Sequence, residues 1–359
     1  MTIFFLRRAF YGLLVLAGVI TVVFLLFNVL PGDPARMMLG QRADQASIDA
    51  INRDLGLDKP LSAQYIMYIN DLMPLSLHEM QNENHYLYLD PAKYDYIKLF
   101  NISKSKVMVL KYPYLRRSYQ SKRKVSEIII ETLPETAVLA FASIILAAFL
   151  GIIGGIITAI YKNTWVDHLS LFLASLGMSG PSFYIGVIIS WVFGYMLSEY
   201  TGLNAIGSLY TIDDYGDGEY LDLKNLILPA VALGIRPLAV VIQLMRNSLL
   251  EVLSSDYIRT ANAKGLRFRT VIFKHALKNA LNPVVTALSG MFASLLAGAL
   301  FVEIIFSWKG VGWELYNALV KYDLPVVMGG VLITSTAFVV INVLVDISYA
   351  ILDPRVRIR

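Results

Sequence analysis

Three ionisable residues lie inside long apolar runs and are the first candidates for chemistry: Arg236, Glu303 and Asp346. Charged side chains inside a membrane span are costly and usually mark function. Arg236 follows Asn225 by eleven residues, so it lies about 16 Å along a helix and near the middle of a bilayer. There it could meet a substrate carboxylate in a water-filled passage, or equally pair with Glu303 or Asp346 as internal structure. For Glu303 and Asp346, we favour a structural or gating role over contact with substrate. Glu303 could cap the outer end of its span.

Motifs for enzyme catalysis are absent from the sequence. It contains no Gly-x-x-x-x-Gly-Lys-Ser/Thr phosphate loop, no Gly-x-Ser-x-Gly elbow and no His-Glu-x-x-His metal motif. There is no cysteine, and His78 and His85, seven residues apart without a carboxylate-rich surround, are a weak metal signal. We therefore expect no catalytic residue, no metal and no cofactor on this chain, and any ATP hydrolysis would belong to a separate subunit.

A polar and basic stretch, residues 246–282, separates two apolar runs and therefore lies outside the bilayer. Gly265 can take the left-handed conformation that ends a helix, so the stretch is predicted to form a helix, a glycine turn and a second helix. The small residues Ala261, Ala263 and Gly265 would let another protein's surface approach the backbone closely. The apolar face of the first helix, at spacings of three, four and four residues, comprises Leu250, Leu253, Tyr257 and Ala261.

The elements that position these residues belong to a strongly hydrophobic chain. Of its 359 residues 56% are hydrophobic, and several apolar runs are long enough to cross a bilayer. We predict an all-α integral membrane protein with six transmembrane helices and an extracytoplasmic α/β insertion between helices 1 and 2. The predicted segments are a first helix in 1–30, an extracytoplasmic segment in 31–126 and a five-helix core in 127–359. The predicted spans are 4–30, 136–161, 169–197, 226–250, 284–306 and 326–352.

Small residues and breakers inside the spans predict how the helices pack. Gly180-Pro181 interrupts the third span and predicts a kink rather than two elements. Small residues four apart let two helices approach closely. Such residues are Gly151 and Gly155 in the second span and Gly290, Ser294 and Gly298 in the fifth.

The segment between the first two spans carries further patterns. Asp44 and Asp58 can each begin a short amphipathic helix. Residues 75–120 are rich in tyrosine and alternate in 85–89 and 106–112, which suggests one or two short hairpins. This insert could contact a substrate-delivering partner, because exposed tyrosines suit interfaces, or it could be a cap without separate activity.

Basic residues in short loops indicate the orientation of a multi-pass protein. The loops at 198–225 and 307–325 hold only three lysines. The basic cluster at 104–124 lies in a long segment, which translocates largely regardless of charge. Both termini and the 246–282 stretch are therefore predicted to be cytoplasmic. The basic residues on that side are Arg7, Arg8, Lys162, Arg246, Arg259, Lys264, Arg267, Arg269, Lys274, Lys278, Arg355, Arg357 and Arg359.

The 246–282 stretch resembles a known family. Tyr257-Ile-Arg-Thr-Ala-Asn-Ala-Lys-Gly265, followed by His275-Ala-Leu-Lys-Asn-Ala-Leu and Pro283, is similar to the EAA loop of ABC importer permeases of the oligopeptide/dipeptide/nickel branch. The resemblance implies a coupling helix that docks in a groove on an ATPase subunit. From the residues alone, a basic amphipathic hairpin lying on anionic lipid is the alternative. The coupling residues so implied are Glu251, Asp256, Tyr257, Arg259, Ala261, Ala263, Lys264 and Gly265.

Other parts of the chain resemble the same permeases. Glu303 and Asp346 match acidic positions of two family motifs, whereas the family does not generally carry an arginine at the position of Arg236. Residues 75–120 depart from the family pattern. The matching stretches are Pro31-Gly-Asp-Pro34, Leu55-Gly-Leu-Asp-Lys-Pro60, Phe301-Val-Glu-Ile-Ile-Phe-Ser-Trp-Lys-Gly-Val-Gly312 and Asn342-Val-Leu-Val-Asp-Ile-Ser-Tyr-Ala-Ile-Leu-Asp-Pro-Arg355.

The resemblance implies the permease subunit of an ATP-driven importer in a bacterial inner membrane. Expected partners are a second homologous permease, two ATPase subunits that hold ATP and Mg²⁺, and an extracytoplasmic substrate-binding protein, but no nucleic acid. Dipeptides, oligopeptides and nickel complexes stay open as cargo, as does pairing with an identical or a different permease. Two other classes also stay open. One is an ATPase-independent secondary transporter or channel, which would more often show internal repeats, and the other is a membrane scaffold with an outer interaction domain.

Overall fold

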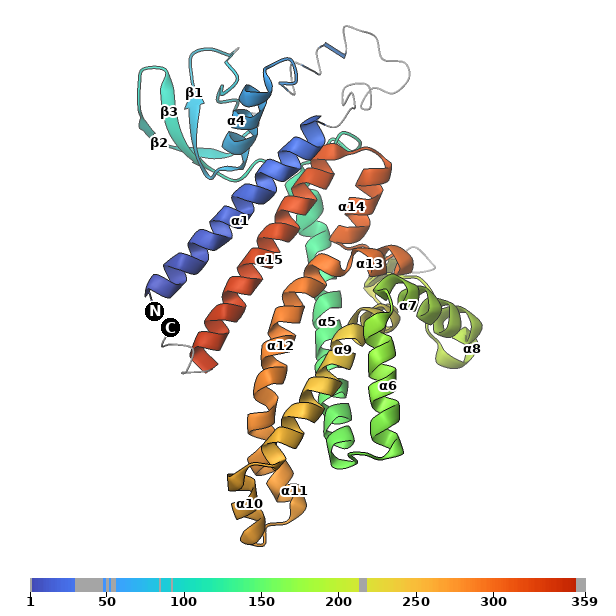
Figure 1. Ribbon diagram of the computed structural model, residues 1–359. Helices are drawn as coiled ribbons and strands as arrows, with labels where there is room; N and C mark the ends of the chain where they lie inside the picture. The colour runs from blue at the N-terminus through green and yellow to red at the C-terminus, as the bar shows by residue number, and fades with distance from the viewer. Residues whose placement is uncertain are drawn as a thin grey trace. The chain divides into compact units, whose positions relative to one another are not determined.

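A computed structural model describes residues 2–29, 48–49, 52, 56–83, 85–91, 93–212 and 218–352 (Figure 1). The chain divides into two compact units. One is built around Thr132–Trp313, and the other combines Ile3–Glu131 with Glu314–Thr336. These units follow packing rather than order along the chain, so the consecutive segments 1–30, 31–126 and 127–359 stay a prediction.

Helices dominate the described part of the chain, which confirms the all-α membrane class. Among the described residues, five helices are long and apolar enough to cross a membrane, and a bent pair would make a sixth. Several begin earlier than predicted; the second span starts at Val125 rather than near residue 136. The span-forming elements are α1 (Thr2–Val29), α5 (Val125–Ile160), the pair α6 (Trp165–Ser179) and α7 (Ser182–Ile189), α9 (Lys224–Leu253), α11 (Phe268–Thr270) continuing through a π-helical segment η3 (Val271–Ala276) into α12 (Leu277–Gly298), and α15 (Leu324–Leu352).

The third predicted span is two elements rather than one kinked helix. α6 and the run formed by α7 and a π-helical segment η2 (Ser190–Met196) are bent by 110°. Pro181 lacks an amide hydrogen and cannot continue α6, while the N–H of Gly180 closes α6 by donating to the Leu176 carbonyl at 3.2 Å. The prediction of a simple kink is therefore wrong. A short helix α8 (Ser198–Thr201) and the unpredicted strand pair β4 (Tyr210–Ile212) and β5 (Glu219–Leu221) follow.

The fifth predicted span also ends differently. α12 stops at Gly298, and α13 (Leu300–Phe306) follows as a separate short helix. Ser307 then takes a left-handed backbone, with φ at 54°, before α14 (Val311–Val320) begins. The prediction of one helix over 284–306 is therefore wrong at its outer end, because the helix is interrupted at Ala299, which lies between α12 and α13.

The core of the Thr132–Trp313 unit depends on a close approach of α5 to α9. A Cβ added to Gly151 would lie 2.6 Å from Val241, and one added to Gly155 would lie 2.5 Å from Met245. The same Cβ at Gly155 would be 2.9 Å from the carbonyl oxygen of Ile242. Since side chains do not approach so closely, only glycine fits, and the predicted helix contact is confirmed.

The small residues of the fifth span face outward instead. No described heavy atom outside the local helix lies within 4 Å of a Cβ placed on Gly290, and Ser294 is exposed. The surroundings of Gly298, the third of these small residues, lie outside the part of the chain that the structure describes. Gly290 and Ser294 therefore pack on no other helix within the described part of their own unit.

The unit containing Ile3–Glu131 holds a small α/β region. α4 (Leu61–Leu72) forms where the pattern after Asp58 predicts it, whereas the helix predicted from Asp44 lies largely outside the described residues. The alternation in 106–112 is confirmed as a strand, but 85–89 forms only an isolated bridge of Tyr88 with Glu79. The strands β1 (Leu75–Glu79), β2 (Tyr96–Asn101) and β3 (Lys106–Lys111) pair antiparallel in the order β1-β3-β2.

A buried polar cluster joins α4 to this sheet. The hydroxyl of Tyr94 donates to Oδ1 of Asp71 at 2.5 Å, and Nζ of Lys111 donates to the Asp71 carbonyl at 2.6 Å. His78 is 1% exposed, and its Nε2 lies 3.3 Å from Nδ2 of the Asn70 side chain. Burial, followed by the nearby charge of Lys111, lowers the pKa of His78 to about 4, and burial lowers the pKa of Lys111 to about 8.

Gly155→Ala is expected to destabilise the α5–α9 contact, because the new Cβ would meet backbone as well as side chain. Overpacking of this kind costs about 1–3 kcal/mol. Gly154→Ala is the matched control, since its Cβ would meet only the flexible side chain of Ile242, at 3.2 Å. The measurement is the unfolding temperature of the full chain in detergent, and equal values for the two variants would contradict the contact.

His78→Gln is expected to remove part of the acid sensitivity of the sheet. The unfolded state binds a proton on His78 near pH 6.5 and the folded state only near pH 4, so acidification through this window favours unfolding, by about 3 kcal/mol in full. Hydrogen exchange of the β1 and β3 amides measures this, with wild type and variant compared at each pH. Wild type should lose protection relative to the variant as the pH falls; identical profiles would refute the linkage.

Candidate functional site

The hairpin between α9 and α12 stands at one end of the Thr132–Trp313 unit (Figure 1). α9 ends at Leu253, α10 (Asp256–Ala263) follows, and Gly265 turns the chain back with φ at +74°. No described heavy atom beyond its chain neighbours lies within 4 Å of a Cβ placed on Gly265, so the left-handed backbone, and not lack of space, favours glycine there. The predicted helix, glycine turn and second helix are confirmed.

The single helix predicted across residues 250–261 is broken at two serines. Oγ of Ser254 donates to the Glu251 carbonyl at 2.7 Å, and Oγ of Ser255 donates to the Val252 carbonyl at 2.6 Å. Serine hydroxyls that bond nearby carbonyls compete with the helix, and Ser255 has an extended backbone with ψ at 154°. The predicted face of Leu250, Leu253, Tyr257 and Ala261 is therefore not continuous.

The inner face of α10 packs on the hairpin's own core. Ile258 is 1% exposed and Ala261 is 7% exposed, and both lie in one apolar cluster with Leu249 of α9 and with Val271 and Ala276 of η3. This cluster joins α10 to both neighbouring helices. Ala261 therefore leaves room for the hairpin itself, and the expectation that it lets a partner approach is corrected.

The outer face of α10 is charged and open. Arg259 Nη1 lies 3.3 Å from Asp256 Oδ1, and because both side chains are largely exposed this pair contributes only about 0–1 kcal/mol. Tyr257 is 44% exposed, and its hydroxyl accepts a hydrogen bond from Nδ2 of Asn279 at 2.8 Å. The predicted coupling residues that are exposed are Glu251, Asp256, Tyr257, Arg259, Ala263, Lys264 and Gly265.

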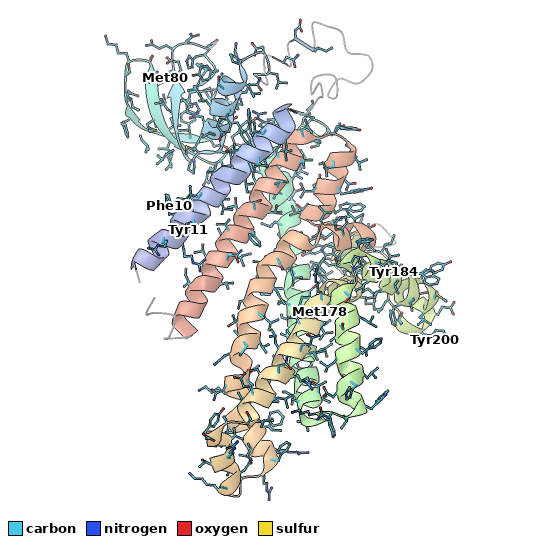
Figure 2. The ribbon with its side chains drawn as sticks, viewed as in Figure 1. Phe10, Tyr11, Met80, Met178, Tyr184 and Tyr200 are labelled. Carbon is cyan, nitrogen blue, oxygen red and sulfur yellow. The ribbon has the colours of Figure 1, made fainter. Side chains whose placement is uncertain are left out.

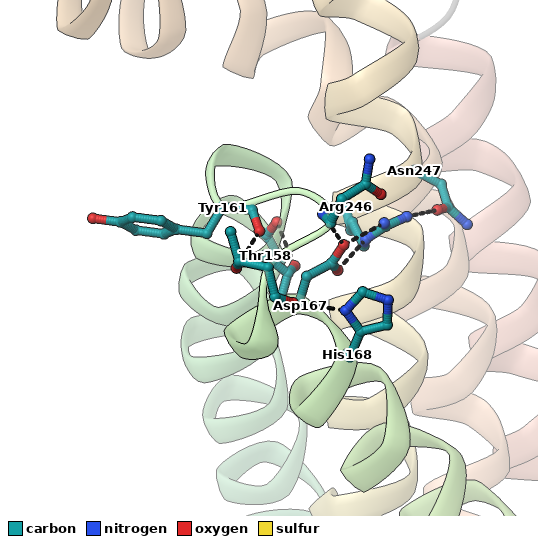
Figure 3. Close-up of polar contacts among 9 residues, drawn as sticks. Thr158, Tyr161, Asp167, His168, Arg246 and Asn247 are labelled. Carbon is teal, nitrogen blue, oxygen red and sulfur yellow. Dashed lines mark hydrogen bonds and ion pairs between the residues drawn. The ribbon is translucent and has the colours of Figure 1, made fainter.

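An ion pair ties the start of α6 to the end of α9 (Figure 3). Nε of Arg246 donates to Oδ1 of Asp167 at 2.6 Å, and Nη2 donates to Oδ2 at 2.7 Å. The N–H of Asn163 also donates to Oδ2, at 2.9 Å. Asp167 is 2% exposed and Arg246 is half-buried, so this is a bidentate pair that is partly shielded from water. Asp167 is absent from the sequence-based candidates, although an acid in the first turn of a span, on the same side as Arg246, was a usable signal.

Arg236 and Glu303 are not partners. Arg236 is exposed on α9 and forms no ion pair with any residue in the described ranges. An exposed cation in mid-span needs water or a charged neighbour from another chain, so a passage shared with a second subunit stays a prediction for it. Asp346 belongs to α15, but its side chain lies outside the described part of the structure.

Glu303 is a fully buried acid with a structural role. One carboxylate oxygen accepts from the Thr136 hydroxyl at 2.7 Å, and the other accepts from the N–H of Trp313 at 3.0 Å, in the first turn of α14. Gly310 and Gly312 pack directly against it, because a Cβ on either would collide with its carboxylate. Glu303 therefore binds the start of α14 rather than capping the outer end of the fifth span.

Asp167→Asn is expected to destabilise the bundle, because it leaves the guanidinium of Arg246 without a counter-charge. Removing one partner of a partly shielded, charge-assisted pair in this way costs about 1–3 kcal/mol. Asp256→Asn is the control, since it breaks an exposed pair. Thermal unfolding of the full chain in lipid nanodiscs measures both, and a loss no larger for Asp167→Asn than for Asp256→Asn would contradict the assignment.

Among solved structures, the chain is similar to a chain of the MetNI methionine ABC transporter in an inward-facing conformation. The alignment covers 64% of this chain and 97% of that chain, with a TM-score of 0.50 at 17% sequence identity. At this identity the similarity shows a shared fold alone.

Curated relatives extend over nearly the whole sequence. The dipeptide transport system permease protein DppB of Alkalihalophilus pseudofirmus is 34% identical, over 98% of this chain and 98% of the relative. The di/tripeptide transport system permease protein DppB of Pseudomonas aeruginosa is also 34% identical, over 95% and 94%.

Two family profiles match the chain. Residues 1–85 match the N-terminal region of binding-protein-dependent transport system membrane components. Residues 151–358 match the binding-protein-dependent transport system inner membrane component itself, and this range contains the hairpin, the Asp167–Arg246 pair and Glu303. Residues 86–150, with β2 and β3, fall between the two matches. The chain therefore belongs to the family of binding-protein-dependent transport system inner membrane components.

Proposed function

We propose that this chain is the permease subunit of an ATP-driven importer of short peptides, and that a separate ATPase moves it through the α9–α12 hairpin. The observation that carries the proposal is the division of α10 into two faces. Its inner face, with Ile258 and Ala261, is fixed to the bundle, while Arg259 on its outer face and Lys264 directly after its last residue are open. An element held firmly on one side and exposed on the other suits the transmission of force.

Contacts within the Thr132–Trp313 unit give such a force a route. A displacement of α10 passes to α9 and η3 through the shared apolar cluster. From α9 it passes to α5 through Gly151 and Gly155, and to α6 through the Asp167–Arg246 pair. Coupling of this kind needs a physical element that both sites bias, and α9 with its fixed neighbours supplies one.

The expected partners follow from the family and from the exposed surfaces. Two ATPase subunits would hold ATP and Mg²⁺ beneath the hairpin, and an extracytoplasmic binding protein would deliver the cargo. The open side of α12 at Gly290 and Ser294 suits close packing against a helix of a second permease. The chain's own residues perform no covalent step.

Cargo and orientation extend the same proposal. Relatives named for dipeptide and di/tripeptide transport favour short peptides over nickel complexes. The basic residues of the hairpin favour a cytoplasmic location for it, and with six spans both termini lie on that side as well. The two other classes, an ATPase-independent transporter and a membrane scaffold, have no use for a docking face on α10.

Reversing two charges on this docking face, with Arg259→Glu and Lys264→Glu together, is expected to detach the ATPase. Repulsive contacts at an interface cost several kcal/mol, so the co-purified ATPase and dipeptide uptake should fall about tenfold or more. The chain itself should reach the membrane in normal amounts, because both side chains are exposed. The measurements are ATPase retained on the purified chain and uptake of labelled dipeptide in cells.

The matched control makes the same charge change elsewhere, with Lys98→Glu and Lys104→Glu on exposed positions of the insert. This control should retain the ATPase fully. Normal ATPase retention and normal uptake in the α10 variant would remove the coupling proposal. Normal retention with lost uptake would move the docking face away from α10.

A further inference from the structure

One face of the run formed by α7 and η2 is exposed and rich in aromatic side chains. Tyr184, Ile188, Trp191 and Tyr195 follow one another at spacings of four, three and four residues, and they are 60%, 42%, 56% and 71% exposed. We call these four residues the aromatic stripe. Tyr200, in α8, continues it at 87% exposure, and Figure 2 shows Tyr184 and Tyr200 on the outer side of the segment.

The opposite face of the same run is fixed to its own unit. A Cβ on Gly186 would lie 3.3 Å from Ile305 of α13, and one on Gly194 would lie 2.4 Å from the backbone of Ala205. Ile189 is also buried, at 8% exposure. The aromatic stripe therefore points away from the unit because its other side is already packed.

The depth of the stripe follows from the length of α6. Its 15 residues extend about 22 Å, less than the roughly 30 Å of a bilayer's hydrocarbon core. Trp165, at its first residue, is 75% exposed, as expected at a membrane boundary. The 110° bend then turns the chain sideways before the far boundary is reached. The stripe thus runs roughly along the membrane plane, in the leaflet opposite the α9–α12 hairpin.

An apolar cavity lies in the angle of this bend. It has a volume of about 540 Å³ and is lined by α6, α7 and α9. Gly177 and Ala174 of α6, Ile185 of α7 and Leu238 of α9 are among its walls. Exposed side chains of α6, Phe172 at 59% among them, continue the same apolar surface toward the hairpin end.

We propose that the aromatic stripe binds bilayer lipid, with its phenol and indole groups just below the headgroups of that leaflet and with acyl chains in the cavity of the bend. Tyrosine and tryptophan combine an apolar ring with a hydrogen-bonding group and are enriched at this depth. Residues 181–197 contain no charged side chain, whereas a protein interface has a polar rim. The surface is also continuous with exposed apolar side chains of the candidate span α6, such as Leu173 and Leu176.

The test uses the absence of cysteine from the chain. Single substitutions Tyr184→Cys, Trp191→Cys and Tyr195→Cys carry a nitroxide label on the full chain, purified with its co-purifying subunits in lipid nanodiscs. Collision rates of the label with oxygen, which concentrates in lipid, and with a water-soluble nickel chelate are measured. Tyr112→Cys, in the insert and 84% exposed, is the aqueous control.

The proposal requires oxygen to collide several-fold more often than the nickel chelate at the stripe, and the reverse at residue 112. Faster collision with the nickel chelate at the stripe would place it in water and overturn the proposal. Low accessibility to both reagents would also overturn it, because a protein partner would then cover the stripe. Uptake by each labelled chain confirms that the protein remains assembled.

Discussion

The permease core depends on how closely the backbones of α5 and α9 approach. In lipid the hydrophobic effect no longer drives helices together, so their association depends on van der Waals contact and hydrogen bonds. Glycines on both helices allow that contact. A Cβ added to Gly155 of α5 would lie 2.9 Å from the carbonyl oxygen of Ile242, and one added to Gly234 of α9 would lie 2.9 Å from the carbonyl oxygen of Ser143. Because α9 also contacts α6, α7, α12 and α13, its placement against α5 determines the position of every helix around it.

Much of this architecture could be predicted from the sequence because the signals are local. A run of apolar residues is a property of one segment, and so are the glycine of a helix end and the basic stretch between two spans. The sequence alone therefore indicates the spans, the hairpin with Gly265, and the helix contact made by Gly151 and Gly155. The EAA-like stretch added the family, since similarity over a short motif does not depend on knowing the fold.

What sequence could not supply depends on contacts between distant segments. Gly180-Pro181 predicts only a kink, whereas the separation into two helices at 110° depends on the packing of α7 on α9 and α13. Arg236 and Glu303 have the same signature, a charge inside an apolar run, yet they are opposite cases. Glu303 is buried and accepts a hydrogen bond from the hydroxyl of Thr136, 167 residues earlier in the chain, whereas Arg236 lies exposed on α9.

The two ends of α6 show how this bundle can move without coming apart. At its start, the Asp167–Arg246 pair is directional, since both hydrogen bonds of the fork require a fixed alignment of carboxylate and guanidinium. Rotation of α9 therefore carries the start of α6 with it. At its far end, α6 leads into α7, whose inner face is packed on α9 and α13, so this end is held within the unit as well. Only the outer stripe has lipid as its proposed contact, and a lipid contact is non-directional and can slide. A displacement at the hairpin would therefore carry α6 along with α9, while the stripe moves through the lipid without breaking a specific contact.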